Sequence, residues 1–218
     1  MQKDLFLKTE GNNYYNRNQQ NLDVVNKTSD ELYSGYKKYI NDGMVILEIG
    51  CSDGHNLSQL TKDRKCVAYG IDPSQDAIKD GKHRFPDLKL MVGTADELNL
   101  PDESIDIVIF GFCLYLVDRK LLAKVVAETD RVTKDNAYVG ITDFDVKIPR
   151  KRRYKHYEDI YSYKYDYSKL FLAYPQYSLI EKWNKPSKES VFFSNIEERI
   201  GTTVLYKNHK DAYLFEAD

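Results

Sequence analysis

The sequence predicts an α/β fold, in which helices cover both faces of a mainly parallel sheet. Short apolar runs rich in β-branched residues alternate with segments whose apolar residues recur at helical spacing. A loop with two glycines, residues 50–54, separates the first apolar run from the first helical segment, and the second apolar run ends at Asp72. A strand, glycine loop, helix and strand in this order typically bind a nucleoside at the carboxyl ends of the strands.

Residues 1–42, which precede the sheet, are expected to form a flap and a helix. Asparagine and glycine are dense in residues 10–18, which predicts a loop. Tyr15 and Arg17 within it suit either a flap that closes over a ligand or an arm packed on the surface. Apolar spacing from about residue 21 to residue 40 predicts a helix, with a break where polar residues can cap a helix N-terminus.

The loop after the first strand carries the residues of most interest. Gly50 and Gly54 allow a tight turn and a close approach to a ligand, because glycine has no Cβ atom. The carboxylate of Asp72 can accept hydrogen bonds from the two hydroxyls of a ribose. Pro73 and Ser74 suit the first turn of the helix that follows.

Seven strands are expected, and helical segments follow the first, second and fourth of them. The fourth strand leads into an aromatic segment with Phe110, Phe112 and Tyr115, and the fifth ends at Asp143. No internal repeat or low-complexity linker interrupts residues 1–218, so a single domain is predicted. The strands are predicted at residues 44–49, 66–71, 88–92, 104–110, 137–142, 178–183 and 202–207.

Residues 146–178 differ in composition from the rest of the chain. They contain eight of its 18 tyrosines and a basic run at residues 150–153. Tyrosine suits carbohydrate and nucleotide-sugar sites, because its ring offers an apolar face and its hydroxyl a hydrogen bond. We therefore expect a tyrosine-rich cap that is inserted after the fifth strand and recognises the substrate. The alternative is a surface helix pair with a solvated basic face.

The overall composition is that of a soluble globular protein, with 42% hydrophobic and 30% charged residues among 218. A formal net charge of −2 argues against a nucleic-acid partner and against an anionic membrane surface. The three cysteines lack metal-ligand spacing, so free thiols and no metal site are expected. No apolar run is long enough for a signal peptide or a membrane span, which predicts a cytoplasmic location.

The pattern Glu48-x-Gly50-x-Ser52-x-Gly54, followed by Asp72, resembles the cofactor motif of class I S-adenosylmethionine-dependent methyltransferases of the type 11-like group. Ser52 departs from the family pattern, which has the middle one of its three glycines at this position. The resemblance implies a Rossmann-like, doubly wound sheet of seven strands with the last strand antiparallel. It also implies S-adenosylmethionine as the cofactor and S-adenosylhomocysteine as the product.

The resemblance assigns further residues to the cofactor. Ala95 and Asp96 stand where the family reads adenine, the segment after the fourth strand contacts the methionine end, and a tyrosine of the flap would cover the sulfonium. The implied cofactor-binding residues are Glu48, Gly50, Ser52, Gly54, Asp72, Pro73, Ala95, Asp96, Phe110, Phe112, Tyr15 and Arg17.

The glycine loop also has three alternative interpretations. Gly-x-Ser-x-Gly is the nucleophile elbow of α/β-hydrolases, with Ser52 as nucleophile and His156 as its partner, but too few elements precede it. A nicotinamide-dependent dehydrogenase would need G-x-G-x-x-G spacing, which is absent. The third interpretation is a packed turn that binds nothing.

The expected reaction is in-line methyl transfer to the oxygen or nitrogen of a small-molecule acceptor, without a metal. His156 is the first candidate base, because the unperturbed pKa of histidine lies near working pH, and Asp143 is the second. The candidate acceptor-binding residues are Tyr115, Tyr154, Tyr163 and Lys164.

A narrower resemblance concerns the acceptor. Residues 10–18, 111–119 and 154–167 are similar to a bacterial subgroup that often accompanies surface-polysaccharide genes, which implies a sugar or nucleotide-sugar acceptor. The alternatives are a non-catalytic, cofactor-binding scaffold protein and an RNA methyltransferase guided by the basic run 150–153.

Overall fold

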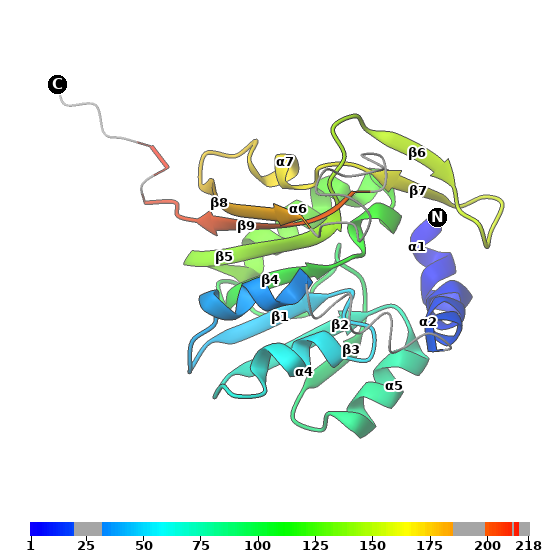
Figure 1. The fold of residues 1–218 in the computed structure, drawn as a ribbon, viewed down its shortest axis with the longest axis horizontal. Helices are drawn as coiled ribbons and strands as arrows, with labels where there is room; N and C mark the ends of the chain where they lie inside the picture. The colour runs from blue at the N-terminus through cyan, green and yellow to red at the C-terminus, as the bar shows by residue number, and fades with distance from the viewer. Residues whose placement is uncertain (20–31, 185–198, 211, 214–218) are drawn as a thin grey trace.

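The computed structural model describes residues 1–19, 32–184, 199–210 and 212–213. Its centre is a seven-stranded sheet with the strand order β3-β2-β1-β4-β5-β9-β8 (Figure 1). The pairs among β1 to β5 are parallel, whereas β9 runs antiparallel to both β5 and β8. The predicted sheet with an antiparallel last strand is therefore confirmed. The strands are β1 (Val45–Ile49), β2 (Val67–Asp72), β3 (Lys89–Val92), β4 (Ile105–Gly111), β5 (Thr133–Phe144), β8 (Tyr177–Asn184) and β9 (Ile200–Lys207).

Helices cover both faces of the sheet, because successive strand residues point to opposite sides. Leu47 of β1 packs on one face with residues of α6, while its neighbour Ile46 packs on the other with residues of α4 and α5. Strands buried on both faces explain why the sequence shows continuous apolar runs there. The helices are α4 (His55–Thr61), α5 (Gln75–Arg84), α6 (Leu122–Val132) and a 3-10 helix (Ser34–Tyr39).

The N-terminal segment is helical, which corrects the expectation of a loop at residues 10–18. It lies beside the carboxyl ends of the parallel strands (Figure 1). Asparagine and glycine are weak helix formers, so tertiary contacts stabilise this segment instead. The amide of Gln2, for example, donates to the carbonyl oxygens of Leu116 and Tyr161 at 2.5 and 3.0 Å. The elements are α1 (Gln2–Leu5), a π-helical turn (Phe6–Glu10) and α2 (Gly11–Gln19).

The second predicted N-terminal element, a helix over residues 21–40, is tested only in part. Its expected break at residues 28–30 lies outside the described residues. From Leu32 to Tyr39 the chain is helical, and Tyr36 and Ile40 are fully buried beneath the sheet. This segment packs on the same face as α4.

Residues 150–164 form an antiparallel hairpin that is separate from the main sheet. Its strands are β6 (Arg150–Arg153) and β7 (Tyr161–Lys164), and the short helix α7 (Ser168–Phe171) follows. The alternative of a surface helix pair is therefore wrong. The hairpin stands next to α1 (Figure 1). The interpretation of residues 146–178 as a substrate cap stays a prediction.

Within the described part of the chain, no helix has the length and apolar character needed to cross a membrane. The same residues contain no group of three or more His, Cys, Asp or Glu side chains placed to hold a metal ion.

Candidate functional site

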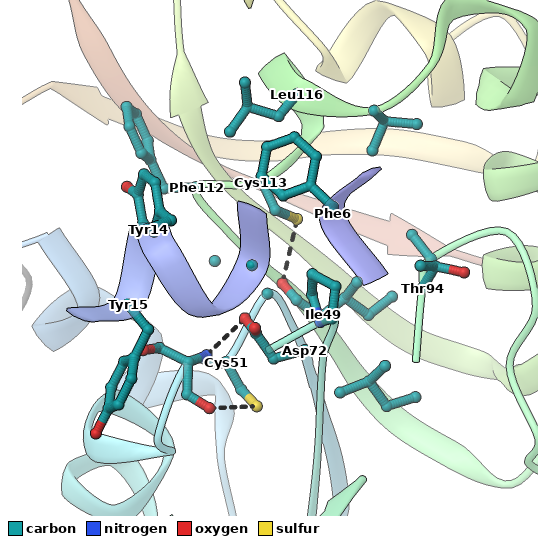
Figure 2. Close-up of a pocket in the computed structure, with 18 of the residues that line it drawn as sticks. Phe6, Tyr14, Tyr15, Ile49, Cys51, Asp72, Thr94, Phe112, Cys113 and Leu116 are labelled. Atoms are coloured by element: carbon teal, nitrogen blue, oxygen red, sulfur yellow. Dashed lines mark hydrogen bonds between the residues drawn. The ribbon is translucent and has the colours of Figure 1, made fainter. Parts of the chain in front are cut away.

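A cavity of about 460 Å³ opens at the carboxyl ends of the parallel strands. Side chains from the N-terminal helices, the glycine loop and the segment after β4 surround it (Figure 2). The residues that line it include Lys3, Phe6, Tyr14, Tyr15, Tyr33, Gly50, Ser52, His55, Asn56, Asp72, Pro73, Ala95, Asp96, Gly111, Phe112, Leu116 and Thr142.

The loop after β1 bends through three residues with positive φ. Gly50, Ser52 and Gly54 have φ values of 77°, 52° and 82°. A Cβ atom at Gly50 would lie only 2.6 Å from the Cβ of Cys113, so a larger residue does not fit there. Ser52 adopts a left-handed conformation that costs a non-glycine residue about 1–2 kcal/mol. The loop therefore keeps its shape despite the departure from the glycine pattern, and it carries local strain.

Asp72 ends β2, and its carboxylate lines the cavity. One oxygen accepts from the backbone N–H of Ser52 and the other from that of Ser74, each at 2.9 Å. Burial raises the pKa of Asp72 to about 6, although these two N–H groups oppose the shift. Each oxygen keeps a second lone pair, so the carboxylate can also accept two hydroxyl donors from a ligand.

Glu48 is buried below the loop, and burial raises its pKa to about 8. The side chains of Tyr33 and Asn56 oppose this shift, yet among the described residues neither carboxylate oxygen has a hydrogen bond within ordinary limits. A Cβ atom at Gly111 would lie 2.8 Å from Oε1 of Glu48 and 2.8 Å from the carbonyl oxygen of Gly50. The Glu48 side chain and the carbonyl oxygen of Gly50 beside this glycine suit a cationic ammonium group, whose charge would favour the ionised form of Glu48.

Asp96 and Ala95 form another part of the wall. The ammonium of Lys3, from α1, lies 2.8 Å from Oδ2 of Asp96. Burial opposes the ionisation of Asp96, but hydrogen bonds from Lys3 and Thr94 outweigh it and hold the pKa below its ordinary value. A ligand at this wall would therefore share Asp96 with Lys3, a contact that the sequence did not indicate.

Phe112 lines the cavity, whereas Phe110 does not, which corrects its assignment as a cofactor contact. Phe110 is fully buried, with its ring 6.1 Å from that of Phe171. β4 ends at Gly111, and Phe112 then adopts a φ of 55°, which gives its side chain a direction different from that of a strand residue. Its ring packs 4.8 Å from that of Tyr115, which helps to hold this strained backbone.

The two flap residues that the sequence singled out are placed differently from the prediction. Tyr15 lines the cavity, but its hydroxyl donates to Asp80 at 3.1 Å, and its ring points away from the other labelled side chains (Figure 2). Arg17 forms an ion pair with the buried Glu10 and does not line the cavity. Tyr14 lines the cavity, and burial together with the nearby Tyr14 side chain raises the pKa of Tyr115.

Neither candidate base lines the cavity. His156 is exposed in the turn between β6 and β7, so the structure does not support its assignment as the base. Asp143 is buried, and its oxygens accept from the backbone N–H groups of Tyr115 and Phe144 at 3.3 and 2.7 Å. Burial raises the pKa of Asp143 to about 7. Its neighbour Thr142 does reach the cavity.

The structure also does not bring the four predicted acceptor-binding side chains to the cavity. Each has a partner elsewhere in the described part of the chain. Tyr115 packs on Phe112, the Tyr154 hydroxyl donates to Glu10 at 2.9 Å, Tyr163 lies 4.4 Å from the guanidinium of Arg119, and Lys164 lies 4.6 Å from the ring of Phe144.

Several lining residues were missed from the sequence. Lys3 and Phe6 come from the first helical turns, and Tyr14 comes from α2, where a loop was expected. His55 and Asn56 begin the helix after Gly54, and this position in the first turn could have identified them, because such turns face the ligand in nucleoside sites. Thr142 precedes the expected strand tip by one residue.

Residues 47–141 match the sequence profile of the methyltransferase domain family. The matched segment runs from β1 into β5 and contains the glycine loop, Asp72, Asp96 and Phe112. Residues 47–141 are therefore a methyltransferase domain.

Curated relatives are similar to rather more than half of the chain. The phthiotriol/phenolphthiotriol dimycocerosates methyltransferase of Mycobacterium tuberculosis is 30% identical over 132 residues, which are 58% of this chain and 44% of that protein. The fatty-acid O-methyltransferase of Mycolicibacterium smegmatis is 28% identical over 125 residues, which are 56% of this chain and 45% of that protein. The chain therefore spans less than half the length of these relatives.

Solved structures extend the likeness beyond the methyltransferase domain to most of the chain. The 1,6-didemethyltoxoflavin-N1-methyltransferase of Burkholderia thailandensis, with bound S-adenosylhomocysteine, has a TM-score of 0.74 at 11% identity and covers 94% of this chain and 88% of its own. A geranyl diphosphate methyltransferase in complex with SAM has a TM-score of 0.63 at 12% identity and covers 84% and 85%. These structures share the fold.

Proposed function

We propose that this protein transfers the methyl group of S-adenosylmethionine to a small-molecule acceptor. The observation that carries the proposal is Asp72 at the tip of β2, oriented by two backbone N–H groups and open to the cavity. The family match of residues 47–141 supports it independently.

The cavity residues fit each polar part of that cofactor. Asp72 would accept hydrogen bonds from the ribose hydroxyls, and the carbonyl oxygen of Gly50, beside Gly111 in the cavity wall, suits the ammonium of the methionine end. Asp96 would accept from the adenine amine on the side that Lys3 leaves open. Because Gly50 carries no Cβ, the backbone can approach the ligand closely.

When bound, S-adenosylmethionine supplies a methyl group on a sulfonium that becomes neutral as the methyl leaves. Phe112 and Tyr14 would enclose this centre and exclude water, and aromatic faces attract a cation by about 0.5–2 kcal/mol. Positioning of the acceptor in line with the methyl would supply much of the rate. Asp143 remains a proposed base, because its pKa of about 7 suits proton exchange at neutral pH, but its side chain would have to turn from its present contacts to reach the cavity.

The acceptor class is open to two proposals. A sugar or nucleotide-sugar hydroxyl or amine follows from the sequence resemblance. An acceptor with an apolar body is favoured by the cavity, where Phe6, Leu116, Val117 and Leu121 form part of the wall. Relatives whose names state fatty-acid and dimycocerosate substrates support the second class.

Calorimetric titration with S-adenosylmethionine tests the function. We expect saturable binding, and we expect Asp72→Ala to weaken it at least 10-fold, because charge-assisted hydrogen bonds contribute about 1.5–3 kcal/mol. No binding to the wild-type protein would overturn the proposal.

Methyl transfer to cell-extract acceptors separates an enzyme from the scaffold alternative, since a scaffold would bind the cofactor without turnover. In the same assay, His156→Ala is expected to keep wild-type turnover, because the side chain is exposed outside the cavity. A large loss of turnover in that variant, with unchanged cofactor affinity, would restore His156 as the base.

A further inference from the structure

The basic run at residues 150–153 lies on an exposed edge of the molecule. Residues 147–155 contain six basic residues and no acidic one, although the whole chain has a formal net charge of −2. All four residues of β6 are exposed, and within the part of the chain that the structure describes β6 pairs only with β7. Ile148, just before it, is 61% exposed. The acidic residues of the hairpin, Glu158 and Asp159, lie in its turn.

We propose that this edge, residues 147–155, docks the protein on the surface of an anionic lipid bilayer. Clustered lysine and arginine side chains are attracted to anionic headgroups, and an adjacent aliphatic side chain can enter the interface. The combination of six cations with an exposed isoleucine fits a surface that is charged outside and apolar beneath.

The same surface is less suited to RNA, because its aromatic rings are engaged by the protein itself. Proteins bind single-stranded nucleic acid by stacking bases on aromatic faces. Here the ammonium of Lys151 lies 3.8 Å from the ring centroid of Tyr161, and the guanidinium of Arg119 covers Tyr163 at 4.4 Å. Both tyrosines are only partly exposed.

The docking edge is connected to the candidate cofactor cavity. Gln2 of α1 donates to the backbone carbonyl of Tyr161 in β7 and to that of Leu116, which lines the cavity. Lipid binding itself does not depend on the proposed function. Its consequence, that an acceptor with an apolar body reaches the cavity from the bilayer, does rest on that function.

Co-sedimentation with vesicles tests the docking. We expect the protein to bind vesicles of 70% phosphatidylcholine and 30% phosphatidylserine and to show at least 10-fold weaker binding to pure phosphatidylcholine. Each basic residue near the surface contributes roughly 5-fold, so Arg153→Gln with Lys155→Gln should weaken binding by about 25-fold. The matched control, Lys79→Gln with Lys82→Gln on the exposed face of α5, removes the same charge and should bind as the wild type does.

Ile148→Gln separates a bilayer from other polyanions. We expect it to weaken vesicle binding several-fold and to leave any binding of a poly-uridine probe unchanged, since only lipid offers an apolar interior. Equal binding to both vesicle types, no binding to either, an equal effect of both charge-removing pairs, or tighter binding of poly-uridine than of anionic vesicles would overturn the proposal. None of these readings uses S-adenosylmethionine, so failure of the proposed function would be seen separately in calorimetry.

Discussion

Two carboxylates beneath the cavity keep a proton at a higher pH than exposed carboxylates do. Burial raises the pKa of Asp72 to about 6 and that of Glu48 to about 8. For Asp72 the protonation state affects the ligand, because a neutral acid accepts hydrogen bonds less well than a carboxylate. For Glu48 it affects the stability of the ligand-free fold.

The affinity for S-adenosylmethionine should fall as the pH drops below about 6. At pH 5 only about one tenth of Asp72 is ionised, so we expect roughly 10-fold weaker binding than at pH 7. Calorimetry at pH 5, 6 and 7 measures this. In Asp72→Asn the affinity should be lower throughout and nearly flat in this range, and the same slope in both proteins would contradict the assignment.

Glu48→Gln should stabilise the ligand-free protein at high pH. Folded Glu48 keeps its proton up to about pH 8, whereas in the unfolded chain it loses it near 4.5. Between these values the folded state binds more protons, so the free energy of unfolding falls as the pH rises, and the loss is complete above pH 8. Glutamine does not ionise. We expect its gain in Tm over the wild type to be larger at pH 8.5 than at pH 5, by at least about 2–4 °C. An equal gain at both pH values would refute this.

Among the elements, α1 closes one side of the cavity. Besides the contacts of Gln2, the backbone N–H of Lys3 donates to Asp118 at 3.0 Å, and its ammonium pairs with Asp96. Each of these partners belongs to, or adjoins, the cavity wall. α1 is thus positioned by the same segments that would contact a cofactor.

Gln2→Leu together with Lys3→Met should weaken cofactor binding with little change in Tm. The lost hydrogen bonds contribute about 0.5–1.5 kcal/mol each, so a decrease of roughly 3- to 10-fold in affinity is expected by calorimetry. Asp4→Asn is the control, because Asp4 is exposed and its described ion pair is with the amino group of Met1. If the double variant bound the cofactor as tightly as the control, α1 would have no part in the site.

The elements that sequence predicted well are those whose signals are local. β1, the glycine loop and β2 are specified by an apolar run, two glycines and an acidic tip within 30 residues, and the structure places all of them as expected. The sequence does not indicate α1 and α2, because their stability comes from contacts with distant residues, such as Gln2 with Leu116 and Tyr15 with Asp80. β6 was missed because four basic residues carry no strand signal.

The same contrast between local signals and distant contacts applies to the residues of the candidate site. Local pattern predicts Asp72 and Gly50, and both line the cavity. Phe110 was assigned wrongly because the end of β4 and the positive φ of Phe112 cannot be read from the alternation of apolar residues. The chemistry of histidine makes His156 a candidate base, but this chemistry gives no information about where a hairpin turn lies.

At the scale of the whole molecule, the two ends of the parallel strands differ in role. The carboxyl ends carry strained residues, buried carboxylates and the cavity. At the amino ends, Lys207 ends the antiparallel strand β9 and is almost fully buried. Its ammonium donates to the carbonyl oxygens of Asp130 and Thr133 at 2.6 and 2.8 Å, and it lies 3.3 Å from the carboxylate of Asp130. A cation at the C-terminus of α6 is also favoured by the helix dipole.

Lys207→Met should therefore lower the free energy of unfolding and leave the cofactor site intact. Removal of the ammonium leaves two carbonyl oxygens and a partly buried carboxylate without their cation, which we expect to cost about 2–3 kcal/mol. Urea unfolding measures the loss, and calorimetry at 15 °C, where the variant is still folded, should return the wild-type affinity for S-adenosylmethionine. Lys210→Met, at an exposed position just after β9, should change neither quantity. The side chain of Lys207 does not line the cavity. A weaker affinity in folded Lys207→Met would therefore mean that the two ends of the strands are coupled through the sheet.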